Sequence, residues 1–263
     1  MKRLVLIAML ATLVGCARVP LATYTCCKTV DKIAIDGVLN EESWQKAAST
    51  GDFSIWDGKT KSPLATSAKM VWDSENLYIA FECEDPDLYS TLKNKDEALY
   101  TQDVVEVFVM EQSLGASDFV EYEVSVLGTL FDCYLRVPYV GFLEWSSPFK
   151  AATKFTGTLN DPKDKDTGYT VEMAIPFSDF SLRKPWNKAD WKNLTPKNGD
   201  SITLNLYRIE YSTPEKLGET GTKPEYITWS PLLTRPSFHM PERFGIVTFV
   251  DKPVGPRVVV LDK

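Results

Sequence analysis

The stretch Val104–Met110 constrains the fold of this chain most. It is apolar and largely β-branched apart from Glu106 in its middle, a composition typical of a strand buried on at least one face. Successive side chains of a strand point to opposite faces, so Glu106 shares its face with Phe108 and Met110. Burying a carboxylate without a partner is costly, so Glu106 either meets a fixed partner or borders a solvated concavity. We expect Tyr100 and Glu106 to form the edge of a ligand site; a partly exposed strand glutamate is the alternative.

Other segments show the same apolar alternation and predict further short strands. The expected strands are residues 32–35, 66–72, 77–84, 119–127, 130–137, 149–157, 168–175, 202–211, 226–229 and 245–250. Turn sequences such as Asp73-Ser74-Glu75-Asn76 separate them. One short helix is expected over 41–48 behind the N-cap Asn40, and one helical turn over 176–180.

Many short strands with little helix predict an all-β fold, an antiparallel β-sandwich with one or two short helices. No shift in composition and no flexible linker divides the chain. We therefore expect a single domain over residues 30–252, followed by an irregular, proline-containing tail over 253–263.

The N-terminus has the features of an export signal. Lys2 and Arg3 precede an apolar run, residues 4–14, that is too short to span a membrane. The following Gly15-Cys16 resembles a bacterial lipoprotein signal, in which residues 1–15 are removed and Cys16 is lipidated. An ordinary secretory signal and an uncleaved anchor are the alternatives. We expect a lipid-anchored protein of the bacterial cell envelope with residues 16–29 as a tether, and Ala17 favours the outer membrane on either face.

The composition excludes some partners. The formal charge of −7 becomes −9 once residues 1–15 are removed, because Lys2 and Arg3 are the charges lost. An acidic chain without a basic run is not expected to bind nucleic acid. Aromatic residues make up 12% of the sequence and include 7 Trp, which favours ligand contacts in addition to a core. Of the cysteines besides Cys16, Cys83 and Cys133 alternate in phase with apolar neighbours and suit buried free thiols, although export also permits disulfides.

Several short motifs, in a fixed order over residues 30–250, carry a resemblance to a known family. They are Ile35-Asp36-Gly37 with Trp44, Leu77-Tyr78-Ile79 after the turn at Asp73, Asp103-Val104-Val105-Glu106-Val107-Phe108, Gly168-Tyr169-Thr170-Val171-Glu172 with Ile175-Pro176, Trp229, and Phe244-Gly245. Together they resemble the family 9 carbohydrate-binding modules, and more closely the stand-alone "family 9-like" bacterial proteins of the DOMON-like group. The resemblance implies a β-sandwich that clamps a sugar between two aromatic rings. It also implies structural Ca²⁺ in several members, and no organic cofactor is expected.

The resemblance assigns roles to three residues. Tyr100 lies three residues before the Asp of the Asp-x-x-Glu-Val-Phe segment, where the family has one clamp ring, and Phe238 lies ahead of the closing Phe-Gly, where it has the other. Glu106 is the residue that would accept hydrogen bonds from sugar hydroxyls. The family's best-known members look like tryptophan at both clamp positions, so this chain offers less stacking area. They also use an arginine on the strand where this chain has Glu121 and Glu123, which puts the sugar specificity in question.

Three further residues complete the expected binding site. Glu123 lies on a neighbouring strand, Arg136 offers a hydrogen-bond donor, and Trp145 lies with Tyr139 in a loop that can close over a ligand. A loop anchor packed on the sandwich is the alternative for Trp145. Trp44, Trp72 and Trp229 are expected in the core.

The sequence favours a non-catalytic, carbohydrate-binding lipoprotein that grips a mono- or oligosaccharide. A glycoside hydrolase is one alternative, because Asp103/Glu106 and Glu121/Glu123 provide paired carboxylates. A haem-binding DOMON-like domain is another, although His239 is the sole histidine. Serine-hydrolase and zinc sites lack the residues they need. A partnership within a glycan-uptake complex is compatible with sugar binding.

Overall fold

The computed structural model describes residues 19–110, 118–136, 140–181, 195–211 and 224–255. The first half of the chain holds, in order, β1 (Thr23–Lys28), α1 (Glu42–Lys46), β2 (Ser54–Ile55), β3 (Thr66–Trp72), β4 (Asn76–Glu84), the 3₁₀ turn η1 (Leu99–Thr101), β5 (Val104–Met110), β6 (Phe119–Ser125) and β7 (Leu130–Arg136). The second half holds β8 (Val140–Phe142), β9 (Lys150–Thr156), β10 (Gly168–Pro176), η3 (Phe177–Ser181), β11 (Ser201–Glu210), β12 (Glu225–Thr228), η5 (Pro241–Arg243) and β13 (Gly245–Pro253).

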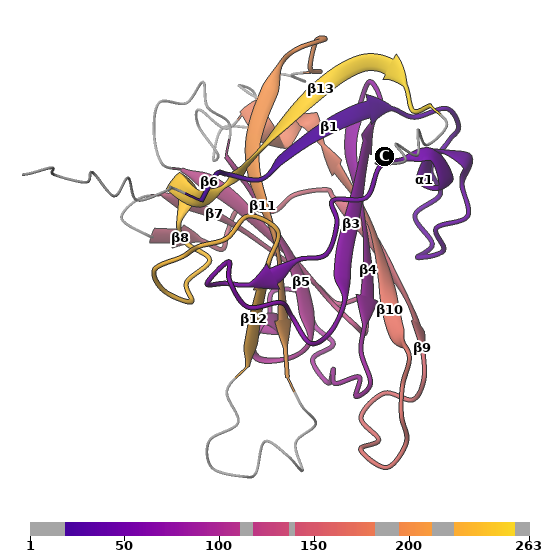
Figure 1. Ribbon diagram of the computed structural model, residues 1–263, viewed down its shortest axis with the longest axis vertical. Helices are drawn as coiled ribbons and strands as arrows, with labels where there is room; N and C mark the ends of the chain where they lie inside the picture. Colours follow the sequence, from indigo (N-terminus) through magenta and orange to yellow (C-terminus); the bar gives the residue numbers. More distant parts are fainter. Residues whose placement is uncertain (1–18, 111–117, 137–139, 182–194, 212–223, 256–263) are drawn as a thin grey trace, which may run out of the picture.

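The strands form one continuous hydrogen-bonded sheet that folds over itself into two facing layers. Its strand order is β8-β7-β6-β5-β11-β13-β1-β3-β4-β10-β9, and β12 and β2 extend it beside β11. In Figure 1, β6 to β8 lie towards the left, β11 and β5 lie near the middle, β3, β4, β10 and β9 lie towards the right, and β1 and β13 cross at the top. This arrangement confirms the predicted β-sandwich.

The core lies between the two layers, and the alternation of side chains selects its residues. Val105, Val107 and Val109 of β5 point into it from one layer, and Ile79 and Phe81 of β4 point into it from the other. All five side chains are at most 2% exposed. Glu106 and Phe108 lie on the opposite, outer face of β5, as their phase requires.

That outer face carries a second apolar cluster, under the segment between β12 and β13. Phe108 stacks on Phe119, with ring centroids 5.4 Å apart, and Phe238 and Phe244 pack over them from the covering segment. The sequence pattern predicted a loop here, and the loop is anchored by its own aromatic side chains rather than by the main core.

The outer face of the other layer is partly covered by α1. Trp44 donates its indole N–H to Glu172 Oε1 of β10 at 2.7 Å, and the backbone N–H of Gly37 donates to Glu172 Oε2 at 2.7 Å. Gly37 has φ +82°, and a Cβ there would lie 2.7 Å from the backbone of Thr153. The Asp-Gly and Trp positions of the motif are therefore joined through one buried carboxylate, which fixes the helix to the sheet.

Several details differ from the sequence-based expectations. Residues 23–28, assigned to the tether, form β1 inside the sheet, and β1 pairs with both β13 and β3 in parallel, so the sheet is not purely antiparallel. Residues 32–35 form no strand. The tail boundary is also wrong, because β13 continues to Pro253 and Val254 is 5% exposed against the cluster that holds Trp44.

Other differences are local. Two short strands, β2 and β8, lie outside the strand ranges expected from the sequence. The helix is shorter than predicted and begins after Glu41, whose side chain makes no capping hydrogen bond. Asp31 takes over the cap, because its carboxylate accepts hydrogen bonds from the N–H groups of Glu42 and Ser43.

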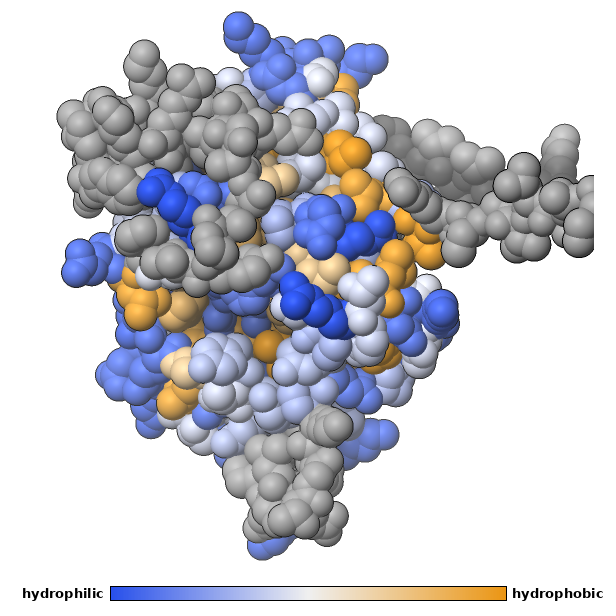
Figure 2. All heavy atoms as spheres, turned by 90° about the vertical axis from the view of Figure 1, so that its left-hand side faces the viewer, coloured by the Kyte–Doolittle hydropathy of each residue, from blue (hydrophilic) through white to orange (hydrophobic). Residues whose placement is uncertain are grey.

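The cysteines of the described residues, Cys26, Cys27, Cys83 and Cys133, form no disulfide with one another, and Cys83 and Cys133 are buried. Within the same residues, none of the helices has both the length and the apolar character needed to cross a membrane. Cys16 lies outside the described residues. On the side shown in Figure 2, hydrophobic residues gather in separate groups among hydrophilic ones rather than in one broad patch.

Candidate ligand-binding site

A pocket of about 370 Å³ opens on the outer face of β5 and β6. Four of the six predicted binding residues line it: Tyr100 from η1, Glu106 from β5, Glu123 from β6 and Phe238 from the segment that covers this face. Residues from across the sequence thus converge where the Asp-x-x-Glu-Val-Phe pattern predicted a ligand site.

Strand register explains why the acidic residues meet. Glu106 lies opposite Glu123 across the β5–β6 pair, and Phe108 lies opposite Glu121. Directly opposed residues of antiparallel strands share a face, so Glu106, Glu121 and Glu123 all point into the pocket. We refer to these three residues as the acidic triad. Asp103 is an odd number of residues from Glu106 and points elsewhere, so Asp103 and Glu106 do not form a working pair.

The acidic triad is almost entirely buried: Glu106 is 2% exposed, Glu121 8% and Glu123 0%. Burial raises the pKa of Glu106 well above its ordinary value, and the nearby Glu121 raises it further. Burial likewise raises the pKa of Glu121 to about 7, against a lowering by its contact with Glu123. The pKa of Glu123 is raised by burial and then by repulsion from Glu106 and Glu121. At neutral pH the triad therefore holds protons that ordinary glutamates would have lost.

Glu123 is the least satisfied member of the triad. Neither of its carboxyl oxygens has a hydrogen bond of good geometry, and the nearby backbone N–H of Tyr100 only partly offsets the rise in its pKa. The Glu121 carboxyl also contacts Glu123, and two carboxyls can hydrogen-bond to each other only if one of them is protonated. A buried acceptor without a donor is unfavourable in the free protein, so a ligand that brings donors would relieve it.

The aromatic side chains that line the pocket differ in solvent exposure. Tyr100 is 53% exposed, so its ring is open to a ligand. Phe238 is 5% exposed and stacks on Tyr207, with centroids 4.0 Å apart and planes inclined by 11°. Tyr207 also donates a hydrogen bond to the backbone carbonyl of Phe238 at 3.0 Å. One face of Phe238 is thus already covered, and the ring is held firmly in place.

Two predicted binding residues do not line the pocket. Arg136 shares the alternation phase of Tyr134, which belongs to the main core, and its Nε lies 3.3 Å from Asp118 Oδ2. Trp145 is 6% exposed and packs edge-on against Tyr122 in the main core. The loop-anchor alternative therefore describes Trp145, while Tyr139 lies outside the described residues.

The sequence-based reasoning missed Tyr226 and Phe131, which also line the pocket. The alternation of side chains along the two strands could have identified both residues. Ile227 is fully buried in the main core, so Tyr226 must lie on the other face of β12, and Phe131 lies opposite Glu123 across the β6–β7 pair. His239 lines the pocket too, beside Phe108 and Phe119.

A separate cluster of charged groups lies at one end of the core. Arg208 of β11 is 0% exposed and places Nη2 3.3 Å from Asp85 Oδ2 and against Glu210 Oε2. Asp103 accepts backbone hydrogen bonds from Tyr89 and Tyr211. This cluster joins the two layers, because Arg208 also donates to the backbone carbonyl of Glu84, the last residue of β4.

The same cluster offers carboxylate oxygens of the kind that bind Ca²⁺. Carboxylate oxygens of Asp85, Asp103 and Glu210 all lie within 4.8 Å of one another, and hard oxygen ligands suit Ca²⁺. Asp85 Oδ2 accepts no hydrogen bond. Three ionised carboxylates exceed the single charge of Arg208 by two, which a divalent cation would balance. Burial raises the pKa of Asp85 and Asp103, and that of Glu210 to about 8, so proton release would accompany binding.

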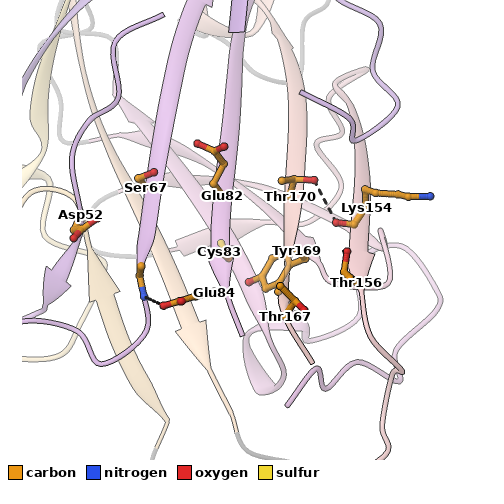
Figure 3. Close-up of a pocket in the computed structure, with 12 residues that line it drawn as sticks. Asp52, Ser67, Glu82, Cys83, Glu84, Lys154, Thr156, Thr167, Tyr169 and Thr170 are labelled. Carbon is orange, nitrogen blue, oxygen red and sulfur yellow. Dashed lines mark hydrogen bonds between the residues drawn. The ribbon is translucent and has the colours of Figure 1, made fainter. Parts of the chain in front are cut away.

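A second hollow of about 450 Å³ lies on the other layer (Figure 3). Its rim carries Lys154, Thr156 and Thr170, and the Thr170 hydroxyl hydrogen-bonds to backbone carbonyls. Lys69 pairs with Glu82 at 3.4 Å beside it. Tyr169 is 3% exposed, so among the residues lining this hollow none presents an open aromatic ring comparable to Tyr100.

The protein is thus an all-β sandwich with an acidic, aromatic pocket on the outside of one layer. The model of the family "Carbohydrate family 9 binding domain-like" matches residues 35–252. The chain belongs to this family.

Individual relatives agree with that assignment. The chain is 28% identical over 192 residues to endo-1,4-β-xylanase A of Thermoanaerobacterium saccharolyticum, a match over 71% of this chain and 13% of that enzyme. A crystal structure of a Bacteroides uniformis protein superposes with a TM-score of 0.65 at 16% identity, covering 88% of this chain and all of the other. A family 9 module of Caldicellulosiruptor kristjanssonii in complex with cellotriose gives 0.60 at 19% identity, covering 91% and 100%. The chain spans only a small part of the length of the xylanase. The two crystal structures share the fold of this chain.

Proposed function

We propose that this protein is a non-catalytic carbohydrate-binding protein whose pocket at Tyr100 and the acidic triad holds a mono- or oligosaccharide. The observation that carries the proposal is an open tyrosine ring beside buried carboxyls in one pocket. The family membership supports it, as does the cellotriose complex of the Caldicellulosiruptor kristjanssonii module.

The chemistry of the pocket suits a sugar. A pyranose has apolar C–H faces, which stack on aromatic rings, and a rim of hydroxyls, which need acceptors and donors. Tyr100 supplies the open stacking surface. The buried carboxyls accept hydroxyl protons, and a protonated carboxyl can also donate. Phe238 also lines the pocket, and we propose that the sugar contacts both the exposed ring of Tyr100 and this fixed ring.

Calorimetric titration with the best ligand from a glycan array tests this function. Replacing Tyr100 by alanine should weaken binding about tenfold or more, because a stacking ring contributes about 1 kcal/mol beyond its buried area and 1.4 kcal/mol is a factor of ten. Tyr100→Phe keeps the ring and should retain most of the affinity. Glu106→Gln should weaken binding severalfold, because an ordinary hydrogen bond contributes about 0.5–1.5 kcal/mol.

The matched control is Thr156→Ala in the second hollow, which should leave the affinity unchanged. If Tyr100→Ala binds as tightly as the unmodified protein while Thr156→Ala does not, the sugar site is the second hollow. Turnover of a β-1,4-linked oligosaccharide that vanishes in Glu106→Gln would identify a glycoside hydrolase instead.

We further propose a lipid anchor at Cys16 in the bacterial cell envelope, on the strength of the signal-like residues 1–15. The Cys16→Ser protein should then appear in the soluble fraction of its host. Retention of this variant in membranes washed with concentrated salt would rule the lipid anchor out.

Finally, we propose that Asp85, Asp103 and Glu210 hold a structural Ca²⁺ ion. The convergence of three buried carboxylates on one point, with an excess of negative charge over Arg208, supports it. The ion would cross-link the two layers, and it would lie apart from the sugar pocket.

A further inference from the structure

The pocket is negatively biased. Among the residues that line it, three are glutamates and none is lysine or arginine. Its one histidine, His239, has a pKa lowered by burial and then by the nearby Arg235. The imidazole is therefore neutral and adds no positive charge to offset the glutamates. The charged and titratable groups facing the triad or its neighbours are Tyr100, Tyr207, Tyr211, Tyr226, Arg235, His239 and Glu242.

Glu123 indicates which chemical group of a ligand the pocket favours. It is fully buried, it lines the pocket, and neither of its oxygens has a hydrogen bond of good geometry. A neutral hydroxyl can supply one hydrogen bond to such an oxygen but no charge. An ammonium group supplies three N–H donors together with the positive charge that stabilises ionised carboxylates.

A bare metal ion suits the acidic triad less well. In the described part of the chain, the carboxylate group that converges within 4.8 Å is Asp85, Asp103 and Glu210, not the triad. Glu106 and Glu123 are directly opposed across two strands, and Glu121 is displaced by one pleat repeat towards Phe108. Acceptors spread in this way suit several donors on one rigid ring better than a single point charge.

We propose that the pocket selects a sugar with a protonated amine, that is, an amino-sugar unit of a glycan, over the corresponding neutral sugar. This inference rests on the proposed function, because it concerns the same site. The ammonium lies against Glu121 and Glu123, Glu106 accepts a neighbouring hydroxyl, and the C–H face of the ring stacks on Tyr100.

The burial of the triad adds a measurable consequence. In the free protein the raised pKa values keep protons on the carboxyls. An arriving ammonium favours their ionised forms, so binding of the amino sugar releases protons to the buffer. A neutral sugar of the same shape has no charge with which to drive that release.

Three ligands that share one β-1,4-linked backbone test the proposal: an oligosaccharide of glucose, one of N-acetylglucosamine and one of glucosamine. They differ only in carrying a hydroxyl, an acetamide or an amine at one carbon. Near pH 6, where the amine is protonated, we expect the glucosamine oligomer to bind at least tenfold more tightly than the other two. Calorimetry in buffers of different ionisation enthalpy should show net proton release for that ligand alone.

Variants of the triad locate the effect. Glu121→Gln and Glu123→Gln should each lower the affinity for the glucosamine oligomer far more than the affinity for the glucose oligomer, so that most of the preference for the amine and most of the proton release are lost. Since these buried substitutions can alter folding, each variant is compared by its melting curve, and the affinity is measured on the folded protein. Glu75→Gln, at an exposed position in the β3–β4 turn, is the matched control and should change neither quantity.

The outcomes separate this inference from the proposed function. If the neutral oligomer binds in a Tyr100-dependent way and the amine gives no advantage, the amino-sugar preference is wrong and the sugar-binding function stands. If the amine preference persists in Glu121→Gln and Glu123→Gln, the triad is not its source and the inference fails. If no sugar binds at all, both proposals are overturned.

Discussion

Glu121 illustrates how strand pairing changes the chemistry of a residue. Its side chain is buried between Phe108 and the other two members of the acidic triad, and its pKa rises to about 7. An isolated glutamate in the unfolded chain titrates near its ordinary value of 4.5. Folding therefore increases the proton affinity of this carboxyl, which links stability to pH.

We predict that the protein becomes less stable as the pH rises from about 4.5 to about 7. A carboxyl whose pKa is higher in the folded state binds more protons when folded, so the free energy of unfolding falls with rising pH until the folded pKa is passed. The fall due to Glu121 should exceed about 1 kcal/mol, since one pKa unit corresponds to about 1.4 kcal/mol. Urea unfolding across this pH range measures it.

Glu121→Gln should flatten that dependence, because an amide does not titrate. Glu75→Gln, at an exposed turn position, should leave the pH dependence of stability unchanged. A slope that is unchanged in Glu121→Gln would mean that other groups are responsible, of which Asp179 and Glu210 also have raised pKa values, to about 6 and about 8.

At the scale of elements, the ends of β4, β5 and β11 are joined by the cluster of Asp85, Asp103, Arg208 and Glu210. Arg208 Nη1 donates to the backbone carbonyl of Glu84 in the facing layer at 2.7 Å. The backbone N–H of Tyr211, just after β11, donates to Asp103 Oδ1 at 2.7 Å. The Asp of the Asp-x-x-Glu-Val-Phe motif therefore stabilises the ends of strands, while the Glu of the same motif faces the ligand pocket.

We predict that Ca²⁺ raises the melting temperature of the protein relative to EDTA. A ligand present at a hundred times its dissociation constant stabilises the folded state by about 2.7 kcal/mol, and roughly 2–4 °C follows per kcal/mol for a domain of this size. The rise should be lost in Asp85→Asn and retained in Asp52→Asn, an exposed carboxylate outside the cluster. Equal melting curves in Ca²⁺ and EDTA would show that Arg208 alone balances the cluster.

At the scale of the whole molecule, β1 decides how the two layers are connected. It lies between β13 and β3 in the sheet. The Tyr24 hydroxyl donates to the backbone carbonyl of Ala48 at 2.6 Å and accepts from the N–H of Met70 at 3.0 Å. If Cys16 carries the proposed lipid anchor, the tether is short: six residues lie between Cys16 and Thr23, a reach of at most about 25 Å.

We predict that a chain beginning at Thr29 does not fold stably, whereas one beginning at Val19 does. The shorter chain loses β1, together with the buried Tyr24 and Cys26, and exposes the edges of β13 and β3. Circular-dichroism melting and size-exclusion chromatography compare the two. A cooperative transition at the same temperature in both would show that β1 is dispensable.

The fold class and most strands could be predicted from the sequence, because alternation between apolar and polar residues is a local property. Val105 and Val107 had to face one side and Glu106 the other wherever the strand lay. The same alternation in Tyr24 and Cys26 was a sign of β1, but two positions in a short polar run were too few to distinguish it from a tether.

The sequence by itself determined which side chains share a face: Glu121 with Glu123, and Tyr100 ahead of the strand that carries Glu106. Only the tertiary structure decided that strand order brings β5, β6 and β12 together, that Phe238 closes over them, and that Arg136 and Trp145 do not take part. Those outcomes depend on pairings between residues far apart in the chain. Such pairings follow from the burial of the whole core, which no local pattern specifies.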